Sequence, residues 1–375
     1  MKKNYFSPTL LLLMGLFVLF SCQSDNDEYT EITPTPTTPT GTPVSADLSQ
    51  VPYPKLSDYH FFTGALKNNT PNDHVLPYEI ASGLFTDYAH KKRFVWMPEN
   101  TKAVYNGDGK VVTFPIGTVL IKTFYYDNVQ PENKTQIIET RLMIKKGVDS
   151  EGVDQWIFAN YIWNDSQTDA VLDMNGSYRS LTWTENGQTK STNYRIPSSV
   201  ECLTCHKKDE KAIPIGPKPQ NLNIVYNYTD GAKNQLTKWM ERGMLQSGYP
   251  ANITSTINWQ DTSKPLELRV RSYLDINCAH CHSENSHCDY RPMRFAFSET
   301  SNPVNLGICV EPQEFIDNDL THIVSRGKFQ RSMLHFRLQS TDEANRMPLL
   351  GRTMAHEEAV QMIEQWISSL NPTCP

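Results

Sequence analysis

Residues 111–126 read VVTFPIGTVLIKTFYY, and this stretch sets the character of the first half of the chain. It holds two runs of β-branched and aromatic residues, VVTF and TVLIKTFYY, which are joined through a Pro and a Gly. Residues of this kind favour strands, whereas Pro and Gly favour the connections between strands. Similar runs follow at 137–145 and 155–163. We therefore predict a β-rich domain over residues 53–200.

A hairpin is predicted at residues 180–196. Asn186-Gly187 lies there between two alternating arms, LTWTE and TKSTNYRI. Asn-Gly favours a type I′ turn, because both central residues of that turn need a positive φ. The sequence of 53–200 has no nucleophile–base pair, phosphate-binding loop or metal-ligand spacing. Its aromatic residues are therefore interpreted as core, with a surface that covers a partner or cofactor as the alternative.

Composition sets the outer bounds of the interpretation. The chain has 375 residues, of which 38% are hydrophobic, enough to bury the cores of about two to three domains. Its 18 Gly and 24 Pro are too few for a collagen-like or wholly disordered chain. A formal net charge of −6 argues against nucleic-acid binding, because neutralising phosphates requires an excess of clustered Lys and Arg.

The N-terminus has the pattern of an export signal. Two lysines are followed by an uncharged apolar run at 10–20, which is too short to span a bilayer comfortably, and a Ser stands directly before Cys22. This order is typical of a bacterial lipoprotein signal peptide over residues 1–21, with Cys22 lipidated; a plain secretory signal is the alternative. Residues 22–52, rich in Thr and Pro, are predicted to be an extended tether that acyl chains anchor to a membrane.

Two copies of one short motif stand out in the second half. Residues 202–206 read CLTCH and residues 278–282 read CAHCH, so both fit C-x-x-C-H. This is the attachment sequence of c-type haem, in which two thiols bond the porphyrin and the His binds iron. We predict two covalently bound haem c groups, attached through Cys202, Cys205, Cys278 and Cys281, with His206 and His282 as the iron ligands. The alternatives are a four-sulfur zinc site, which leaves both histidines unexplained, and a thioredoxin-like pair, which lacks a βαβ context.

The second haem module is predicted over residues 265–375. Apolar residues at helical spacing predict helices at 265–275, directly before the haem motif, and at 356–370. Met347 lies just before the second helix, and its thioether is predicted to be the sixth iron ligand. The carbonyl of Pro292 is a weaker candidate partner for the His282 ring.

The first haem module is predicted over residues 201–264, and its sixth ligand is less clear. The carbonyl of Pro217 is expected to accept a hydrogen bond from Nδ1 of His206 and so fix the ring. A helix is predicted at 231–245, where Met244 or Met240 would be a ligand, although such a stripe is more often core. The sequence is equally consistent with an open iron site, or with a His ligand from the β-rich domain: His60, His74 or His90.

Three cysteines remain after lipidation and haem attachment. Cys288 and Cys309 lie in one loop of the second module, and we predict a disulfide between them, although Cys374 leaves other pairings open. His280 and His287 flank the second haem motif and are expected to be exposed, or hydrogen-bonded to haem propionates.

With these motifs in place, the chain resembles a family of exported bacterial two-haem c-type cytochromes with a β-rich N-terminal region. The resemblance rests on both haem motifs and on the strings LSDYHFFTG at 56–64, PYEIASGLFTDYAHKKRFV at 77–95, FPIGTVLIKTF at 114–124, IETRLMI at 138–144, IPIGPKPQNLN at 213–223 and MPLLGR at 347–352. It implies haem binding and electron transfer, and it supports Met347 as a ligand. Combined with the residue patterns, it predicts a multidomain fold in which a β-rich N-terminal domain precedes mainly α cytochrome c-like haem modules.

The expected function is single-electron transfer in the cell envelope of a Gram-negative bacterium. Donor and acceptor would be redox partner proteins, with the chain anchored by lipid in the periplasm or at the outer membrane. The rival hypothesis is a two-haem peroxidase-like oxidoreductase whose first haem is open. A binding protein whose β-rich domain recognises a glycan or a cytochrome is a third.

Overall fold

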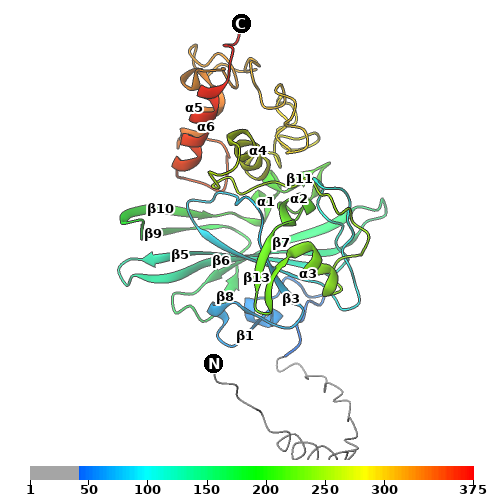
Figure 1. Cartoon of the computed structure of the whole chain (residues 1–375). Helices are drawn as coiled ribbons and strands as arrows, with labels where there is room; N and C mark the ends of the chain where they lie inside the picture. The colour runs from blue at the N-terminus through cyan, green and yellow to red at the C-terminus, as the bar shows by residue number, and fades with distance from the viewer. Residues whose placement is uncertain (1–41) are drawn as a thin grey trace, which may run out of the picture. The chain divides into compact units, whose positions relative to one another are not determined.

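The computed structural model describes residues 42–375, and its largest element is an eight-stranded antiparallel sheet (Figure 1). The strand order is β10-β9-β5-β6-β7-β8, while β4 also pairs with β5, and β3 pairs with β4. The strands are β3 (Val75–Tyr78), β4 (His90–Trp96), β5 (Val119–Val129), β6 (Lys134–Val148), β7 (Asp154–Trp163), β8 (Ala170–Leu172), β9 (Ser177–Glu185) and β10 (Gln188–Ile196).

The predicted strands are mostly confirmed. The runs at 137–145 and 155–163 fall inside β6 and β7, and Asn186-Gly187 forms the two-residue turn between β9 and β10 with φ of 50° and 76°. The run VVTF is not a strand, and only a single bridge joins Thr113 to Val104.

Both faces of the sheet are buried because alternate side chains point to opposite sides. On one face, Ile121 and Leu142 pack against an N-terminal segment that includes Tyr59 and Phe61. That segment holds the short helix η2 (Leu56–Tyr59), the turn η3 (Leu66–Asn68) and the two-stranded pair β1 (Phe62–Thr63) and β2 (Thr70–Pro71).

The opposite face is covered by the segment that follows β10. Leu222 and Trp239 of this segment share one core with Leu120, Met143 and Phe158 of the sheet. Its elements are α1 (Ser199–Cys205), β11 (Lys207–Lys208), β12 (Lys211–Ala212), α2 (Pro219–Leu222), β13 (Val225–Tyr228), β14 (Gly231–Asn234) and α3 (Gln235–Glu241).

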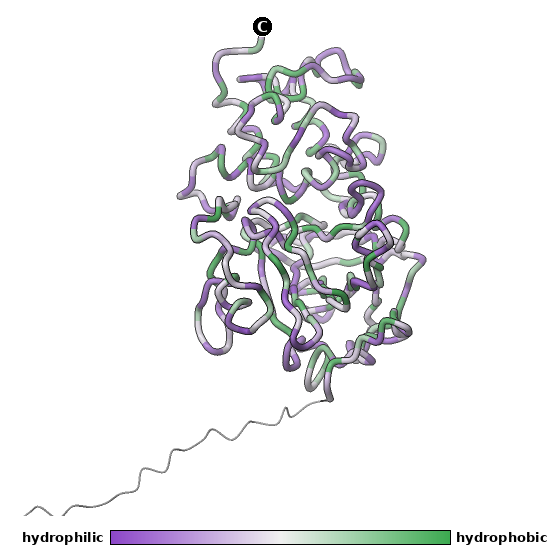
Figure 2. The backbone as a smooth tube through the Cα atoms, turned by 90° about the vertical axis from the view of Figure 1, so that its right-hand side faces the viewer, coloured by the Kyte–Doolittle hydropathy of each residue, from purple (hydrophilic) through white to green (hydrophobic). Residues whose placement is uncertain are grey.

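The C-terminal part has its own core around two longer helices. α4 (Leu266–Asn277) packs on α6 (Glu357–Ser369) through residues such as Val270, Leu274 and Ile363, and these helices confirm the two predicted there. The turn η4 (Phe329–Arg331) and α5 (Met333–Gln339) lie between them in the chain. A long segment of turns links α4 to η4. Figure 2 shows hydrophilic and hydrophobic residues interspersed along the described backbone.

The prediction of mainly α cytochrome c-like modules is wrong. The structure is 28% strand and 18% helical, so β-structure prevails overall. In the first predicted module, the helix expected at 231–245 is reduced to α3, because Gly231–Asn234 pairs with Val225–Tyr228 and the Asn234 side chain caps the helix at Leu236 and Thr237. The rest of that module holds the short helices α1 and α2, two short hairpins and a loop region that follows α3.

The prediction of a Cys288–Cys309 disulfide is also wrong. Cys309 is bonded to Cys374, because the Cys309 backbone hydrogen-bonds to Val324, beside which the C-terminal tail also lies. Cys288 stays next to the second haem motif, where its amide donates to the Cys281 carbonyl, and its thiol is free.

The predictions for the signal peptide at 1–21 and for lipidation of Cys22 lie outside the described residues, as does most of the tether predicted at 22–52. The tether prediction extends too far toward the folded part, because Val51 is only 5% exposed and Leu48 packs beside it. From residue 42 onward, no helix combines the length and apolar character that crossing a bilayer requires.

Candidate functional site

The first motif lies at the end of α1. This helix begins at a capping box in which Ser198 accepts from the Glu201 amide and Glu201 accepts from the Ser198 amide. Cys202 and Cys205 are three residues apart, so both thiols lie on the same side of the helix. His206 follows directly as the C-terminal cap.

His206 is held in a defined tautomer. Its Nδ1 lies 2.9 Å from the carbonyl oxygen of Ile213, and the Ile213 amide donates back to the His206 carbonyl. A carbonyl can only accept, so Nδ1 carries the proton and the Nε2 lone pair is free to bind a metal. Burial lowers the pKa of His206 to about 4, which keeps the ring neutral.

The prediction that Pro217 fixes this ring is wrong, although the expected kind of bond exists. The hairpin β11–β12 turns the chain back at once, so Ile213 reaches His206 before Pro217 does. The Pro217 carbonyl instead accepts from the Val112 amide.

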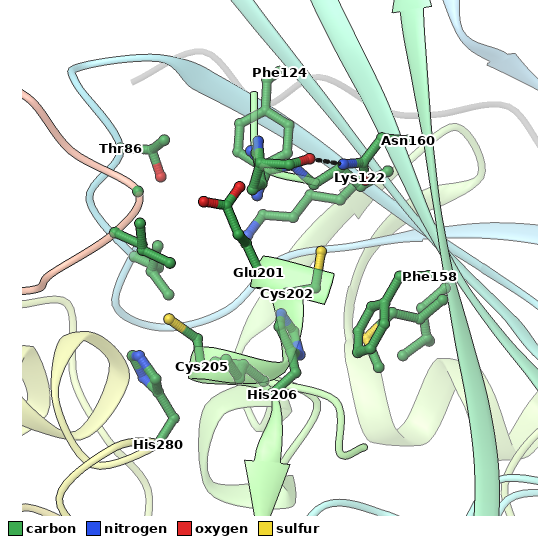
Figure 3. A pocket seen from close by; sticks show the side chains of 18 of the residues that line it. Thr86, Lys122, Phe124, Phe158, Asn160, Glu201, Cys202, Cys205, His206 and His280 are labelled. Carbon is green, nitrogen blue, oxygen red and sulfur yellow. Dashed lines mark hydrogen bonds between the residues drawn. The ribbon is translucent and has the colours of Figure 1, made fainter. Parts of the chain in front are cut away.

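A large cavity adjoins the first motif. Its volume is about 1090 Å³, including a part open to solvent, and Cys202, Cys205 and His206 lie on its wall. Figure 3 shows these residues on one side and Lys122, Phe124 and Asn160 of the sheet on the other. The remaining wall comes from 84–86 and from Pro348, Leu350 and Gly351. We call this space the first cavity.

None of the sixth ligands predicted for the first motif lines the first cavity. Met244 is buried in the core beside Trp239, and Met240 is 37% exposed on α3. His60, His74 and His90 are exposed elsewhere on the β-rich part. The position of Met244 therefore gives no support to its assignment as a ligand.

Other side chains with possible iron-ligand atoms do line the first cavity, among them Met143, Lys122 and His280. Sequence analysis passed over Met143 and Lys122 because they lie in two separate strand-like runs, and the pattern of one strand does not show how it pairs with another. The register supplies the missing information, since Met143 pairs with Phe158, whose ring lies 5.2 Å from that of His206.

The second motif follows α4 and has a cavity of its own. Cys278, His282 and Met347 line a space of about 770 Å³, which we call the second cavity. His282 and Met347, the two predicted ligands of the second iron, therefore line the same cavity. Nδ1 of His282 is buried without a hydrogen-bond partner among the described residues, so the Pro292 carbonyl does not accept from it. Burial also lowers the pKa of His282 to about 4.

The loop that carries Met347 is held by a buried arginine. Arg352 donates to the carbonyls of Met347, Met354, Arg337 and Ser340, and it is only 4% exposed. Four bonds from one planar guanidinium fix the loop to the C-terminal end of α5.

A buried carboxylate holds the same loop from the side of the sheet. Asp87 accepts from the amides of Thr353 and Met354 at 2.6 and 2.8 Å and from the Thr353 hydroxyl. The loop is thus attached to both halves of the molecule.

The two motifs lie next to each other. Ligand atoms of Cys205, His280 and Cys281 are all within 4.8 Å of one another, and a third, smaller cavity of about 390 Å³ is lined by residues of both motifs. The hydrogen bond with Cys281, followed by the effect of His280, lowers the pKa of Cys205 well below its usual value. Of the two histidines expected to be exposed or bonded to propionates, His287 is exposed and His280 is half-buried.

This arrangement does not fit the alternative of a four-sulfur zinc site. All four motif cysteines are free of disulfides, while Cys309 and Cys374 are bonded. A four-sulfur zinc site would need Cys202 and Cys278 within the cluster, and neither belongs to it. Comparison with models of known protein families, with curated proteins and with solved structures gave no match.

Proposed function

We propose that this chain is a two-haem c-type cytochrome that transfers single electrons in the bacterial cell envelope. Cys202 and Cys205 would bond one haem, and Cys278 and Cys281 the other. His206 and His282 would bind the irons, and each bound haem would cycle between ferric and ferrous iron by one electron. Nothing in this assignment requires a bond to be made or broken in a substrate.

The observation that carries the proposal is the pairing of each motif with its own cavity. At the first motif both thiols and His206 line the first cavity, whereas at the second motif Cys278 and His282 line the second cavity and Cys281 borders only the smaller space between the motifs. At the first motif, the bond from Nδ1 of His206 to Ile213 leaves Nε2 as the metal-binding nitrogen. A structural His without a ligand has no need of a cavity beside its free nitrogen.

The short distance between the motifs supports a relay. The sulfurs of Cys205 and Cys281 lie within 4.8 Å of each other, so groups bonded to these two sulfurs would lie close together. Electrons would then pass between the centres without leaving the protein, and redox partner proteins would serve as donor and acceptor. Lipidation at Cys22 would keep the chain at a membrane.

The most direct test is the mass of the intact protein. Chain matured in a host with cytochrome c assembly machinery should carry two added haems and remain red after acid–acetone extraction. Cys202→Ala/Cys205→Ala should lose one haem and keep the other, and Cys278→Ala/Cys281→Ala should do the reverse. Cys288→Ala is the matched control, since this thiol is also free and lines the second cavity, and it should retain both haems. Unmodified mass would refute the proposal.

A metal site at Cys205, His280 and Cys281 is the second candidate, because their ligand atoms already cluster. Two thiolates and an imidazole are typical zinc ligands, with the fourth position open. This site and haem attachment are mutually exclusive, since both use Cys205 and Cys281. Stoichiometric zinc in colourless, natively purified protein would favour the metal site.

The position of Met244 in the core also favours an open first haem, as in the peroxidase-like hypothesis. Carbon monoxide binding to the reduced protein tests this. A spectral change at one haem that Met143→Leu and Lys122→Met leave unaltered would indicate a site without a protein sixth ligand. No change at either haem would mean that both irons have two protein ligands.

A further inference from the structure

One face of the sheet carries a row of cations where it forms the wall of the first cavity. The register sets Arg93 of β4 opposite Lys122 of β5, and Lys122 opposite Arg141 of β6. Directly opposed residues share a face, and like charges placed in this way destabilise a sheet. Lys91 pairs with Phe124, two residues along the strands from the Arg93–Lys122 pair and therefore on the same face. Its ammonium lies 6.0 Å from the centroid of the Phe124 ring. We call Lys91, Arg93, Lys122 and Arg141 the basic row.

Two members of the basic row have anionic partners. Arg93 donates to Glu79 at 2.5 Å. Arg141 donates to both oxygens of Glu139, a side chain with no exposure, through Nε and Nη2. These two pairs leave half of the positive charge of the row without a counterpart.

The ammonium groups of Lys91 and Lys122 are the ones left over. Across residues 42–375, neither forms an ion pair or hydrogen bond, and both lie against the Phe124 ring. Burial, followed by the neighbouring arginines, lowers the pKa of Lys91 to about 7. A charge held away from water is costly unless an opposite charge meets it. A bound anion would offset this cost.

One of the two unpaired ammonium groups, that of Lys122, lies on the wall of the first cavity. Lys122 and Arg141 both line it, within the same space as the first motif. The one acidic side chain on the described wall is Glu201, and its carboxylate already pairs with Arg195. Figure 3 shows Lys122 and Phe124 on the side of the cavity away from Cys205 and His280.

We propose that the basic row binds the two propionate carboxylates of the first haem, with Lys122 and Arg141 making the contacts at the cavity. This inference rests on the proposed function. A haem attached through Cys202 and Cys205 has its propionates on the porphyrin edge away from the thioether bonds, and the sheet supplies the cations on the far wall. The β-rich part would then be half of the first haem site and not a separate module.

The test is a redox titration of the haem-loaded protein with a matched pair of lysine variants. Lys122→Gln removes a cation beside the haem. Loss of this positive charge stabilises ferric iron relative to ferrous iron, so one of the two midpoint potentials should fall. Its propionate bands in the resonance Raman spectrum should shift as well, and Lys122→Arg should restore both. Lys92→Gln removes the same charge from β4, but Lys92 pairs with Thr123 on the other face of the sheet, so both potentials should stay unchanged.

A second arm tests whether the row binds a free anion instead. Inorganic phosphate and succinate are titrated into the wild-type protein and Lys122→Gln while the haem spectra are recorded. If propionates occupy the row, neither anion changes the wild-type spectrum. A saturable change in the wild type that Lys122→Gln abolishes would overturn the propionate assignment in favour of an anion site.

The outcomes separate this inference from the proposed function. If the mass shows no haem at Cys202 and Cys205, the proposed function fails and this inference fails with it. If that haem is present, but Lys122→Gln and Lys122→Met shift neither the potential nor the propionate bands, only the assignment of the basic row is overturned. Lys122→Met keeps the length of the side chain, so it guards against a loss of packing.

Discussion

At the scale of single residues, the proposed function leaves three methionines as candidate ligands of the second iron. Met293, Met333 and Met347 all line the second cavity, but only Met347 also borders the space between the two motifs. We expect Met347→Ala to abolish the charge-transfer band of methionine-ligated haem and to lower the potential of that haem, because a thioether favours ferrous iron. Met333→Ala should retain the band. Loss of the band in Met333→Ala alone would transfer the ligand role to that residue.

A buried histidine should make stability depend on pH. His356 stacks on Phe85 with ring centroids 4.0 Å apart, packs against the edge of Trp259 and shares a hydrogen bond with Tyr273. Burial lowers its pKa in the folded state to about 3, against about 6.5 for an unfolded chain. Between these values the unfolded state binds the proton first, so stability falls as the pH drops below about 6.5.

This linkage is about 2 kcal/mol of unfolding free energy at pH 5 relative to pH 7. His356→Phe keeps an aromatic ring in the stack but cannot titrate. Guanidinium titrations at the two pH values should show a smaller loss for the variant by about that amount. Equal losses in the two proteins would place the titration elsewhere.

At the scale of elements, the sequence predicted regular repeats well and local reversals poorly. Runs of β-branched and aromatic residues located β6 and β7, and apolar spacing located α4 and α6, because each pattern continues over about nine or more residues. The helix expected at 231–245 was cut short by a hairpin and a side-chain cap. The ring partner of His206 was missed for a similar reason: a two-residue hairpin turned the chain sooner than the proline pattern indicated.

The conformation of the Met347 loop should depend strongly on Arg352. Truncation in Arg352→Ala leaves four carbonyls without their donor, and we expect a loss of about 2–4 kcal/mol in unfolding free energy. Arg352→Lys should recover only part, because one ammonium cannot reproduce the planar fork. The exposed Arg331 is the control, and its Ala variant should lie within about 0.5 kcal/mol of wild type.

The same variants give an optical check on the loop. If Arg352 positions the sulfur, the methionine charge-transfer band should weaken in Arg352→Ala at temperatures where the protein is still folded. An unchanged band would mean that the loop keeps its conformation without the arginine.

At the scale of the whole molecule, the predicted boundary near residue 200 does not separate two cores. Leu120, Met143 and Phe158 of the sheet are buried by residues from Leu222 to Ile276. Sequence patterns could locate the strands and helices that form this core, but not which faces of them pack together. Alternation and helical spacing each describe one element at a time. The two C-x-x-C-H motifs could be predicted from their residue spacing. The residues of the cavity walls could be identified only from the register of β5, β6 and β7.

A fragment spanning residues 42–200 should therefore fail to form a soluble domain. It would expose the apolar face that Leu222 and Trp239 cover in the full chain, and a large exposed patch of this kind promotes aggregation. Residues 42–375 should unfold in a single transition measured by circular dichroism, with coincident fluorescence. A monomeric, cooperatively folded 42–200 fragment would contradict this expectation, and it would revive the hypothesis of an independent binding domain.

The loop at 347–351 has one further consequence. Met347 borders the second cavity, Pro348 and Leu350 border the first, and all three border the space between the motifs. A protein that docks on this loop and displaces it would change the walls of both cavities at the same time. Changes in the loop should therefore alter the two sites jointly, and neither can be tuned there in isolation.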